Sequence, residues 1–309
     1  MKIIMPSDNA KETTGLKRAC FQILAGGSAG FVEVSIMQPL DVVKTRLQLQ
    51  NKIVTKSKTE LYTGVFDCFK KMYKNEGVFS FWKGIIPPIM AETPKRALKF
   101  VCFEQLKPLL MFGHEKPTPL TFSLAGLGAG VTEAVAVNPF EVVKVTQQAD
   151  KAHARKAANT FTVTKRIINE NGFGSKGLNK GLTATMSRNG AFNMVYFGFY
   201  NSVKDMYSVN PDPTLEFLKK FCIGFVSGTL ASLFNIPFDV AKSRIQGPQP
   251  DPNKIKYKGT INSILIVYKE EGLAALYKGL VPKVMRLGPG GAIMMLVFEH
   301  VFEYLQDNF

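Results

Sequence analysis

Long apolar stretches alternate along the chain with shorter amphipathic ones. Residues 19–40 and 117–140 each contain a single charged residue, and residues 221–238 contain none. A helix needs about 20 apolar residues to cross a bilayer, so each stretch is long enough if its helix continues a little further. The amphipathic segments are residues 85–110, 182–206 and 281–307. Because such segments suit helices between lipid and a wet cavity, the pattern predicts an all-α membrane protein with six transmembrane helices.

One motif recurs at the end of each apolar stretch. It consists of a proline, any residue, an acidic residue, two further residues and a lysine, and a glutamine follows four residues later. The copies are 100 and 98 residues apart, and a Lys-Gly pair follows each copy before the next helix. The motifs begin at Pro39, Pro139 and Pro237, the glutamines are Gln48, Gln148 and Gln246, and the pairs begin at Lys83, Lys180 and Lys278. A fixed period of this kind indicates tandem repeats of one structural unit.

The period divides the chain into a polar N-terminal tail, residues 1–17, and three repeats, residues 18–112, 113–212 and 213–309. Each repeat is expected to contain two spanning helices joined by a loop with a short helix. Two glycines four residues apart precede every motif proline, as in helices that pack closely in lipid. They are Gly26 with Gly30, Gly126 with Gly130, and Gly224 with Gly228. We therefore predict three pseudo-symmetric tandem repeats packed around a common axis.

The charge is unevenly distributed along the 309 residues. The net charge is +15, which suggests an anionic partner, lipid or substrate. Residues 44–83, 144–180 and 242–278 together hold 24 of the 39 basic residues and only 8 of the 24 acidic ones. In the predicted topology these loops lie on one side of the membrane, as the charge rule for orientation requires. A nucleic-acid-binding protein would instead gather its charge in one patch, so we expect no nucleic-acid partner.

The three motifs predict a ring of alternating charges. A proline inside a helix removes a hydrogen bond and kinks the axis, which would bring the three motif segments together. Charges within a membrane are costly unless they are paired, at about 2.5–3.5 kcal/mol each on insertion scales. We expect the pairs Asp41–Lys144, Glu141–Lys242 and Asp239–Lys44.

The triple motif, together with a later acid-glycine pair and an aromatic-lysine-glycine triplet, resembles the signature of the mitochondrial carrier family. In repeat one the acid-glycine pair begins at Glu76 and the triplet at Trp82. In repeat three they begin at Glu271 and Tyr277. Repeat two departs from it, with Phe173-Gly174 at the corresponding place, and lacks the acid and the aromatic residue. The resemblance covers nearly the whole chain.

This resemblance implies a multi-pass transporter of the mitochondrial inner membrane. It places both termini in the intermembrane space and the basic loops in the matrix, so the charged ring becomes a matrix gate that includes the three motif prolines. We expect a monomer. Glycine-rich helix starts near Gly77, Gly172 and Gly272 offer backbone N–H groups to phosphate, and their family counterparts bind cardiolipin.

A weaker charged motif on the second helix of each repeat resembles the family's cytoplasmic gate. Two of its six charged positions are neutral, Asn201 and Phe302. Pairing each acid with the base of the next repeat gives Glu104–Lys204 and Glu299–Lys107. This gate is therefore expected to close with two ion pairs where the matrix gate has three.

Two arginines are candidates for the substrate site. Arg188 and Arg286 each lie seven residues after the glycine of a Lys-Gly pair, and repeat one has Ala91 there. The planar guanidinium suits carboxylates because it donates two parallel hydrogen bonds. Lys95 and Lys99 share a helix face with Ala91 and extend the positive lining.

Glu92 and Asn189 complete the candidate substrate site, and two other glutamates have a role that stays open. Glu92 lies beside the lysine face, where it restrains a lysine or accepts a proton. Asn189 follows Arg188 in a pairing similar to that of keto-acid carriers in the family. Glu33 and Glu133 each lie six residues before a motif proline, and the sequence leaves open whether they line the cavity or pair with Lys95 or Arg96.

Several local stretches, among them AETPKRALKF and KVMRLGPGGA, are similar to family members that carry 2-oxo dicarboxylic acids. This implies antiport of 2-oxoadipate and related C5–C7 dicarboxylates for 2-oxoglutarate. Carriage of another organic anion, such as citrate or an acidic amino acid, fits the same arginines. A soluble enzyme or helical scaffold is the rival class. The sequence has no nucleophile–base pair, metal cluster or phosphate loop to support an enzyme, so we expect no catalytic residue, metal or cofactor.

Overall fold

The computed structural model describes residues 15–50, 61–151, 158–206, 212–249 and 255–308. Residues 1–14 of the expected N-terminal tail therefore lie outside the described residues. Throughout the described ranges the regular structure is helical, as the sequence predicts. The six long helices are α1 (Gly15–Leu49), α3 (Ile86–Leu109), α4 (Pro119–Ala149), α6 (Leu182–Asp205), α7 (Pro213–Gln246) and α10 (Leu280–Asn308). The short helices are α2 (Val65–Glu76), the 3₁₀ helix η2 (Val78–Trp82), α5 (Thr160–Asn171), α8 (Thr260–Glu271) and α9 (Leu273–Leu276).

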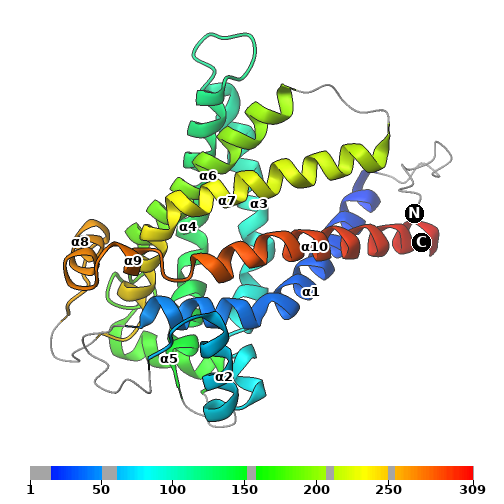
Figure 1. Ribbon diagram of the computed structural model, residues 1–309. Coiled ribbons are helices and arrows are strands. Elements are labelled where there is room, and N and C mark those ends of the chain that lie inside the picture. Colours follow the sequence, from blue (N-terminus) through cyan, green and yellow to red (C-terminus); the bar gives the residue numbers. More distant parts are fainter. Residues whose placement is uncertain (1–14, 51–60, 152–157, 207–211, 250–254, 309) are drawn as a thin grey trace.

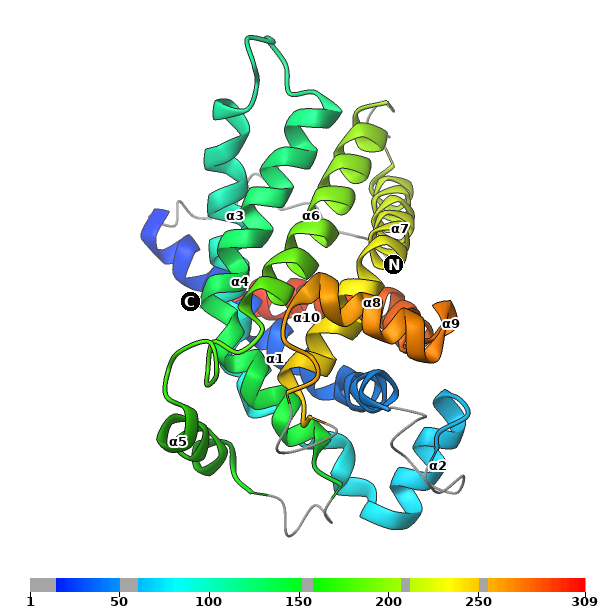
Figure 2. The same cartoon turned by 90° about the vertical axis from the view of Figure 1, so that its left-hand side faces the viewer.

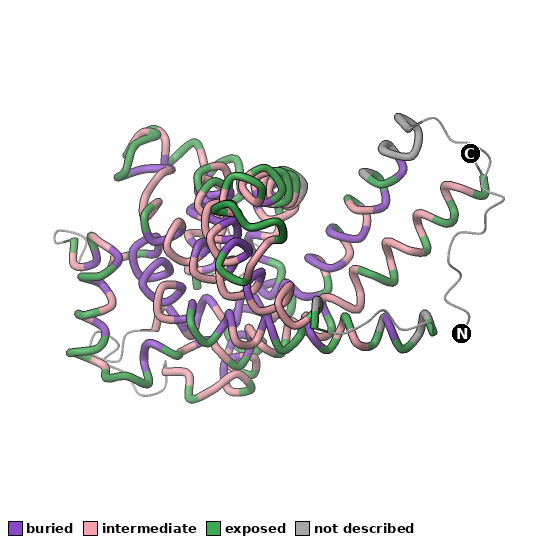
Figure 3. The backbone as a smooth tube through the Cα atoms, turned by 90° about the horizontal axis from the view of Figure 1, so that it is seen from above, coloured by how far each residue is buried: buried purple, intermediate pink, exposed green. Residues whose placement is uncertain are grey.

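The six long helices form a closed ring. Each contacts its two neighbours, in the order α1, α3, α4, α6, α7, α10 and back to α1, and α1, α4 and α7 also contact one another. Figure 2 shows α3, α4, α6 and α7 side by side in that order. The helices converge near the short helices, which we call the short-helix end, and spread apart away from it (Figure 1). The buried backbone is concentrated where they converge (Figure 3).

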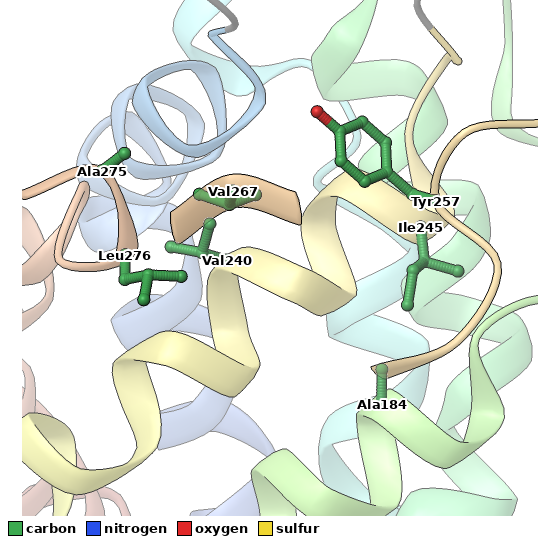
Figure 4. Close-up of a cluster of buried hydrophobic side chains, with 7 residues drawn as sticks. All are labelled: Ala184, Val240, Ile245, Tyr257, Val267, Ala275 and Leu276. Atoms are coloured by element: carbon green, nitrogen blue, oxygen red, sulfur yellow. The ribbon is translucent and has the colours of Figure 1, made fainter. Parts of the chain in front are cut away.

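One apolar cluster in each repeat attaches the short helices to the motif segment. In repeat three, Val267 of α8 lies beside Val240 of α7 and Leu276 of α9 (Figure 4). The corresponding cluster of repeat one joins Val42 and Val43 to α2, and that of repeat two joins Val142 and Val143 to α5. The apolar residues of each motif therefore face a short helix, which leaves its charged residues to face the other repeats.

Both glycines of a pair pack against the backbone of a neighbouring helix only in repeat two. A methyl group added at Gly126 would lie 2.5 Å from the carbonyl oxygen of Asn193, and one at Gly130 would lie 2.4 Å from that of Asn189. At Gly26 nothing lies within 4 Å, and at Gly224 the nearest atom is 3.8 Å away. The expectation of close glycine-mediated packing is therefore confirmed for α4 against α6. It does not hold for Gly26 and Gly224, because the helices there diverge.

Hydropathy separates the long helices into two groups. Judged by length and composition, α4, residues 218–246 and residues 273–308 are long and apolar enough to cross a membrane. Within the described residues, α3 and α6 do not reach that level. The physical reason is the polar residues in these two helices, such as Glu92, Lys95 and Lys99 on α3.

Three glycines with left-handed backbone angles mark the ends of α2, α5 and α8. Gly77, Gly172 and Gly272 have φ values of 83°, 72° and 81°. Gly172 is therefore the structural counterpart of Gly77, and the register based on Phe173-Gly174 is wrong by two residues. The loop before Lys180 is two residues longer than its counterparts, and Asn171 occupies the place of Glu76. Repeat two still lacks the acid.

Candidate functional site

Three ion pairs join α1, α4 and α7 where these helices converge. Each motif acid pairs with the motif lysine of the next repeat, as the sequence leads us to expect. The pairs are Asp41–Lys144 at 2.7 Å, Glu141–Lys242 at 2.8 Å and Asp239–Lys44 at 2.5 Å. We call these six residues the signature ring. The motif prolines Pro39, Pro139 and Pro237 lie inside the same three helices.

Each acid of the signature ring also holds a second cation from α6 or α10. Arg286 Nη1 lies 2.8 Å from Asp41 Oδ1, and Arg188 Nη2 lies 2.6 Å from Glu141 Oε1. Lys283 Nζ lies 3.3 Å from Asp239 Oδ2. The two arginines that the sequence singles out are thus bound to ring acids. Lys283 was missed because it lies outside the recurring motifs.

Both arginines bridge two acids. Arg286 Nη2 also lies 2.7 Å from Glu33 Oε1, and Arg188 Nη1 lies 3.8 Å from Asp239 Oδ1. The Arg286 side chain is 31% exposed and that of Arg188 16%, so both remain reachable from the interior of the helix ring. Planar guanidinium groups with several donors are able to pass from a protein carboxylate to a substrate carboxylate without losing their charge.

The two acids whose partners the sequence left open are now placed. Glu33 pairs with Arg286, and Glu133 accepts hydrogen bonds from Asn189 Nδ2 at 3.3 Å and Asn193 Nδ2 at 3.4 Å. Neither is at salt-bridge distance from Lys95 or Arg96 in the described part of the chain. Asn189, which the sequence assigns to the substrate site, is therefore held by Glu133.

The cluster on α3 is partly self-compensated. Glu92 lies 2.6 Å from Arg96 and 3.9 Å from Lys95 on its own helix. Lys99 Nζ lies 5.5 Å from the centroid of the Phe100 ring. These residues carry more positive than negative charge into the interior.

The three glutamines of the repeats connect α1, α4 and α7 close to the signature ring. Gln148 of α4 accepts a hydrogen bond from Thr45 of α1 at 2.6 Å, and Gln48 of α1 accepts one from Ser243 of α7 at 2.8 Å. Gln246 of α7 donates to Asn138 of α4 at 3.0 Å. All three glutamines are buried. The short-helix end thus contains two polar layers, the signature ring and the hydrogen bonds of the three glutamines.

A second set of buried ion pairs clamps neighbouring repeats together. Glu271 lies 2.7 Å from Arg244 and 2.6 Å from Lys278, and both cations donate to the carbonyl oxygen of Gln50 at the end of α1. The Glu271 side chain is fully buried. Repeat one has an equivalent clamp, with Glu76, Arg46 and Lys83 on the carbonyl oxygen of Asp150.

Repeat two has only part of this clamp. Lys180 donates to the carbonyl oxygen of Gly247 at 3.2 Å, while Thr146 and Asn171 stand in place of the arginine and the acid. Burial lowers the pKa of Lys180 because no acid compensates for its desolvation. The clamp between repeats two and three therefore contains fewer charges than the other two clamps.

The ion pairs expected at the opposite end do not form in this conformation. Glu104 pairs with Lys107 of its own helix at 2.7 Å, and Asn201 Nδ2 donates to the carbonyl oxygen of Phe197 at 2.9 Å. Within the described ranges, no ion pair joins Glu104 to Lys204 or Glu299 to Lys107. The expected interhelical pairs need the helices to come together, whereas here they spread apart (Figure 1).

A groove of about 510 Å³ lies between repeats one and two at the short-helix end. The start of α3 with Gly84 and the start of α5 with Thr160 both border it, and Trp82 and Arg166 line it. Helix starts present unsatisfied N–H groups and partial positive charge, so the groove is suited to phosphate.

The three repeats match one known protein family. The profile described as "Mitochondrial carrier protein" matches residues 18–114, 115–211 and 213–309. The chain belongs to the mitochondrial carrier family. It is therefore a transport protein of a mitochondrial membrane and not an enzyme. This carrier is 57% identical over 301 residues to the mitochondrial 2-oxodicarboxylate carrier of Pongo abelii, covering 97% of this chain and 99% of the relative.

Two further relatives show how far the similarity extends. The mitochondrial 2-oxodicarboxylate carrier of Homo sapiens is 56% identical over 297 residues, covering 96% of this chain and 98% of the relative. The mitochondrial citrate transporter D of Aspergillus niger is 40% identical over 292 residues, covering 93% of this chain and 94% of the relative. The similarity to both extends along nearly all of this carrier.

Proposed function

We propose that this carrier exchanges 2-oxodicarboxylates across the mitochondrial inner membrane. Its substrates would be 2-oxoadipate, 2-oxoglutarate and related C5–C7 dicarboxylates. The main support is that Arg188 and Arg286 are each held by a ring acid, in contacts that a substrate carboxylate is able to replace. The 2-oxodicarboxylate carriers that this chain resembles over nearly all its length support the same substrate class.

Charge balance favours a doubly charged anion. The signature ring is neutral by itself, with three acids and three lysines. Six further bases of the described interior, Lys95, Arg96, Lys99, Arg188, Lys283 and Arg286, face three further acids, Glu33, Glu92 and Glu133. The excess of positive charge in a low-dielectric interior is costly, and a dianion offsets most of it.

Alternating access follows from the competition for the two arginines. In the empty carrier, Asp41 and Glu141 hold Arg286 and Arg188 and are themselves held by ring lysines. A substrate that takes both arginines releases α10 from Asp41 and α6 from Glu141, and leaves the ring held by its three lysine pairs alone. Closure of the opposite end would then form the pairs Glu104–Lys204 and Glu299–Lys107.

The orientation that we propose places the short-helix end in the matrix and both termini in the intermembrane space. The signature ring is then the matrix gate, and Glu104, Lys107, Asn201, Lys204 and Glu299 belong to the cytoplasmic gate. The excess of basic residues in the loops of the short-helix end supports this orientation. We propose that the carrier acts as a monomer, since one helix ring encloses one complete set of substrate cations.

Cardiolipin is the lipid that we propose for the groove beside Trp82. Two helix starts from different repeats meet there, and Arg166 adds a positive charge. A lipid with two phosphates would bridge repeats one and two. The exposed aromatic residues Phe79 and Phe161 on either side suit an acyl-chain boundary.

The substrate class is tested by exchange in reconstituted liposomes. Uptake of labelled 2-oxoglutarate into 2-oxoglutarate-loaded liposomes is measured in the presence of unlabelled 2-oxoadipate, 2-oxopimelate, citrate or glutamate. The proposal requires strong competition by the C6 and C7 2-oxodicarboxylates. Competition by citrate or glutamate alone, or no 2-oxoglutarate uptake, would contradict it.

Citrate is the second candidate substrate. The similarity to the citrate transporter of Aspergillus niger favours it, and Lys95 and Lys99 give a third carboxylate a cationic partner. In that case citrate uptake exceeds 2-oxoglutarate uptake in the same liposomes. A double variant with Lys95→Met and Lys99→Met would then lose citrate transport more strongly than dicarboxylate transport.

A further inference from the structure

Lys283 lies one turn before Arg286 on α10, next to the ring acid Asp239. Its Nζ lies 3.3 Å from Asp239 Oδ2 and 5.5 Å from the centroid of the Phe192 ring, and it donates a hydrogen bond to Asn235 Oδ1. The side chain is 13% exposed. Helices α10, α7 and α6 thus meet at one small polar site beside the signature ring.

Asn235 connects Lys283 to Arg188. Its Oδ1 accepts from Lys283, and its Nδ2 donates to the backbone carbonyl oxygen of Arg188 at 3.2 Å. Asn235 is 3% exposed, so both of its amide groups are used within the protein. An amide held in this way fixes the position of the lysine relative to the start of the arginine side chain.

Positive charge is in excess on this side of the signature ring. In the described structure, Asp239 and Glu141 have four cations at salt-bridge distance, which are Lys44, Lys242, Arg188 and Lys283. On the other side, Glu33 and Asp41 have two, which are Lys144 and Arg286. Cations that are left without an equal number of acids in an interior are costly. An incoming carboxylate is therefore stabilised beside Arg188 and Lys283.

The pair Asn235 and Lys283 occurs in repeat three alone. Counted from the Lys-Gly pairs, the positions equivalent to Lys283 are Thr185 and Pro88. Counted from the motif prolines, those equivalent to Asn235 are Met37 and Val137. The acid–lysine pairs of the signature ring form in all three repeats, although repeats one and two have no equivalent of Asn235 and Lys283. Formation of the ring therefore does not explain the presence of these two residues.

We propose that Lys283, positioned by Asn235, joins Arg188 to bind one carboxylate of the substrate, while Arg286 binds the other. The inference rests on the proposed function and specifies how its dianion is held. The site then has two unequal poles, one with an arginine and a lysine, and one with a single arginine. This asymmetry gives a 2-oxo acid, whose two ends differ, a preferred orientation.

The contact distances show how the carboxylate enters. Lys44 holds Asp239 at 2.5 Å, whereas Lys283 and Arg188 lie at 3.3 and 3.8 Å from it. A substrate carboxylate takes the two longer contacts and leaves Asp239 paired with Lys44. Its two oxygens accept separately from the ammonium and the guanidinium group. The Phe192 ring beside Lys283 gives the methylene chain an apolar surface.

The test uses Lys283→Met and Lys283→Arg in reconstituted liposomes, with Lys269→Met, exposed on α8, as the matched control. We expect Lys283→Met to raise the KM for 2-oxoglutarate about 10- to 100-fold, because the variant loses one charge-assisted hydrogen bond to the substrate. Lys283→Arg should stay within about threefold of the wild type, and Lys269→Met should match it. Inhibition by the two half-amides of 2-oxoglutarate provides the second readout. Lys283→Met should weaken one half-amide and leave the other unchanged, because only one retains the carboxylate that Lys283 binds.

The results separate this inference from the proposed function. A wild-type carrier that exchanges no 2-oxodicarboxylate contradicts the proposed function. A wild type that exchanges them, with a Lys283→Met variant of unchanged KM, overturns the role of Lys283 alone. An equal weakening of both half-amides also overturns it, since a general structural effect does not distinguish the ends of the substrate. If Lys283→Met does not fold in detergent, Lys283→Gln provides the neutral variant for the same comparison.

Discussion

Arg286 Nη1 donates to both carboxylate oxygens of Asp41, at 2.8 Å each. This contact joins a candidate substrate residue directly to the signature ring. Asp41 is at the same time paired with Lys144, so the two functions that the sequence suggests separately depend on one carboxylate. Substrate binding and gate strength are coupled through that carboxylate.

A charge swap in the ring tests this coupling. Exchanging the pair with Asp41→Lys and Lys144→Asp preserves one ion pair of the ring. It also places a lysine beside Arg286, which keeps Glu33 but loses Asp41 and meets a like charge. We expect the double variant to remain at least tenfold below wild-type exchange of 2-oxoglutarate in liposomes. Recovery to wild-type rates would show that the ring acts independently of Arg286.

The close contact between α4 and α6 predicts a strong effect at Gly130. A methyl group there meets the Asn189 carbonyl oxygen at 2.4 Å, so the backbone must move. We expect Gly130→Ala to destabilise the carrier by about 1–3 kcal/mol and to lower its melting temperature in detergent. Gly26→Ala is the matched control, since nothing lies within 4 Å of the added methyl group. Equal melting temperatures for the two variants would contradict the packing described for α4 and α6.

Two adjacent glutamates test the clamp of repeat three. Glu271 is fully buried between Arg244 and Lys278, whereas Glu270 forms an exposed pair with Lys256. Removing one partner of a buried pair costs about 3–5 kcal/mol, and an exposed pair contributes about 0–1 kcal/mol. Glu271→Gln should therefore lower the melting temperature by several degrees, and Glu270→Gln should change it little. A reversed order would rule out the clamp as a source of stability.

The incomplete gate at the opposite end predicts a variant that slows transport. Asn201→Asp combined with Phe302→Lys supplies a third interhelical pair when that end closes. The closed state is then over-stabilised, and the exchange rate of 2-oxoglutarate should fall in reconstituted vesicles. An unchanged rate would count against a gate formed by these residues.

The symmetric parts of the site were predictable from the sequence. The pairs Asp41–Lys144, Glu141–Lys242 and Asp239–Lys44 follow from three equal motifs. One choice, that each acid pairs with the lysine of the next repeat, fixes all three pairs. The pairing of Arg286 with Asp41 was not predictable, since it depends on how far α10 lies from α1. Lys283 and Asn235 were missed for a different reason: they occur in one repeat, and the search for recurrence passes over single residues.

Departures from symmetry also caused the errors. The loop before Lys180 is longer by two residues, so aligning backwards from it put Phe173-Gly174 in the place of Asn171-Gly172. The left-handed φ of Gly172 corrects the register. Likewise, three equal glycine pairs suggested three equal contacts. Only Gly126 and Gly130 both pack against the backbone of the next helix, whereas Gly26 and Gly224 lie where the helices spread apart.

Trans-stimulation of uptake tests the central claim most directly. In the empty carrier Asp41 and Glu141 hold both arginines, so the carrier should change sides only when a substrate replaces them. Uptake of labelled 2-oxoglutarate is measured into liposomes loaded with unlabelled 2-oxoglutarate and into liposomes without internal substrate. The account predicts rapid uptake into the loaded liposomes and at least tenfold slower uptake into the empty ones. Equal uptake into both would contradict it.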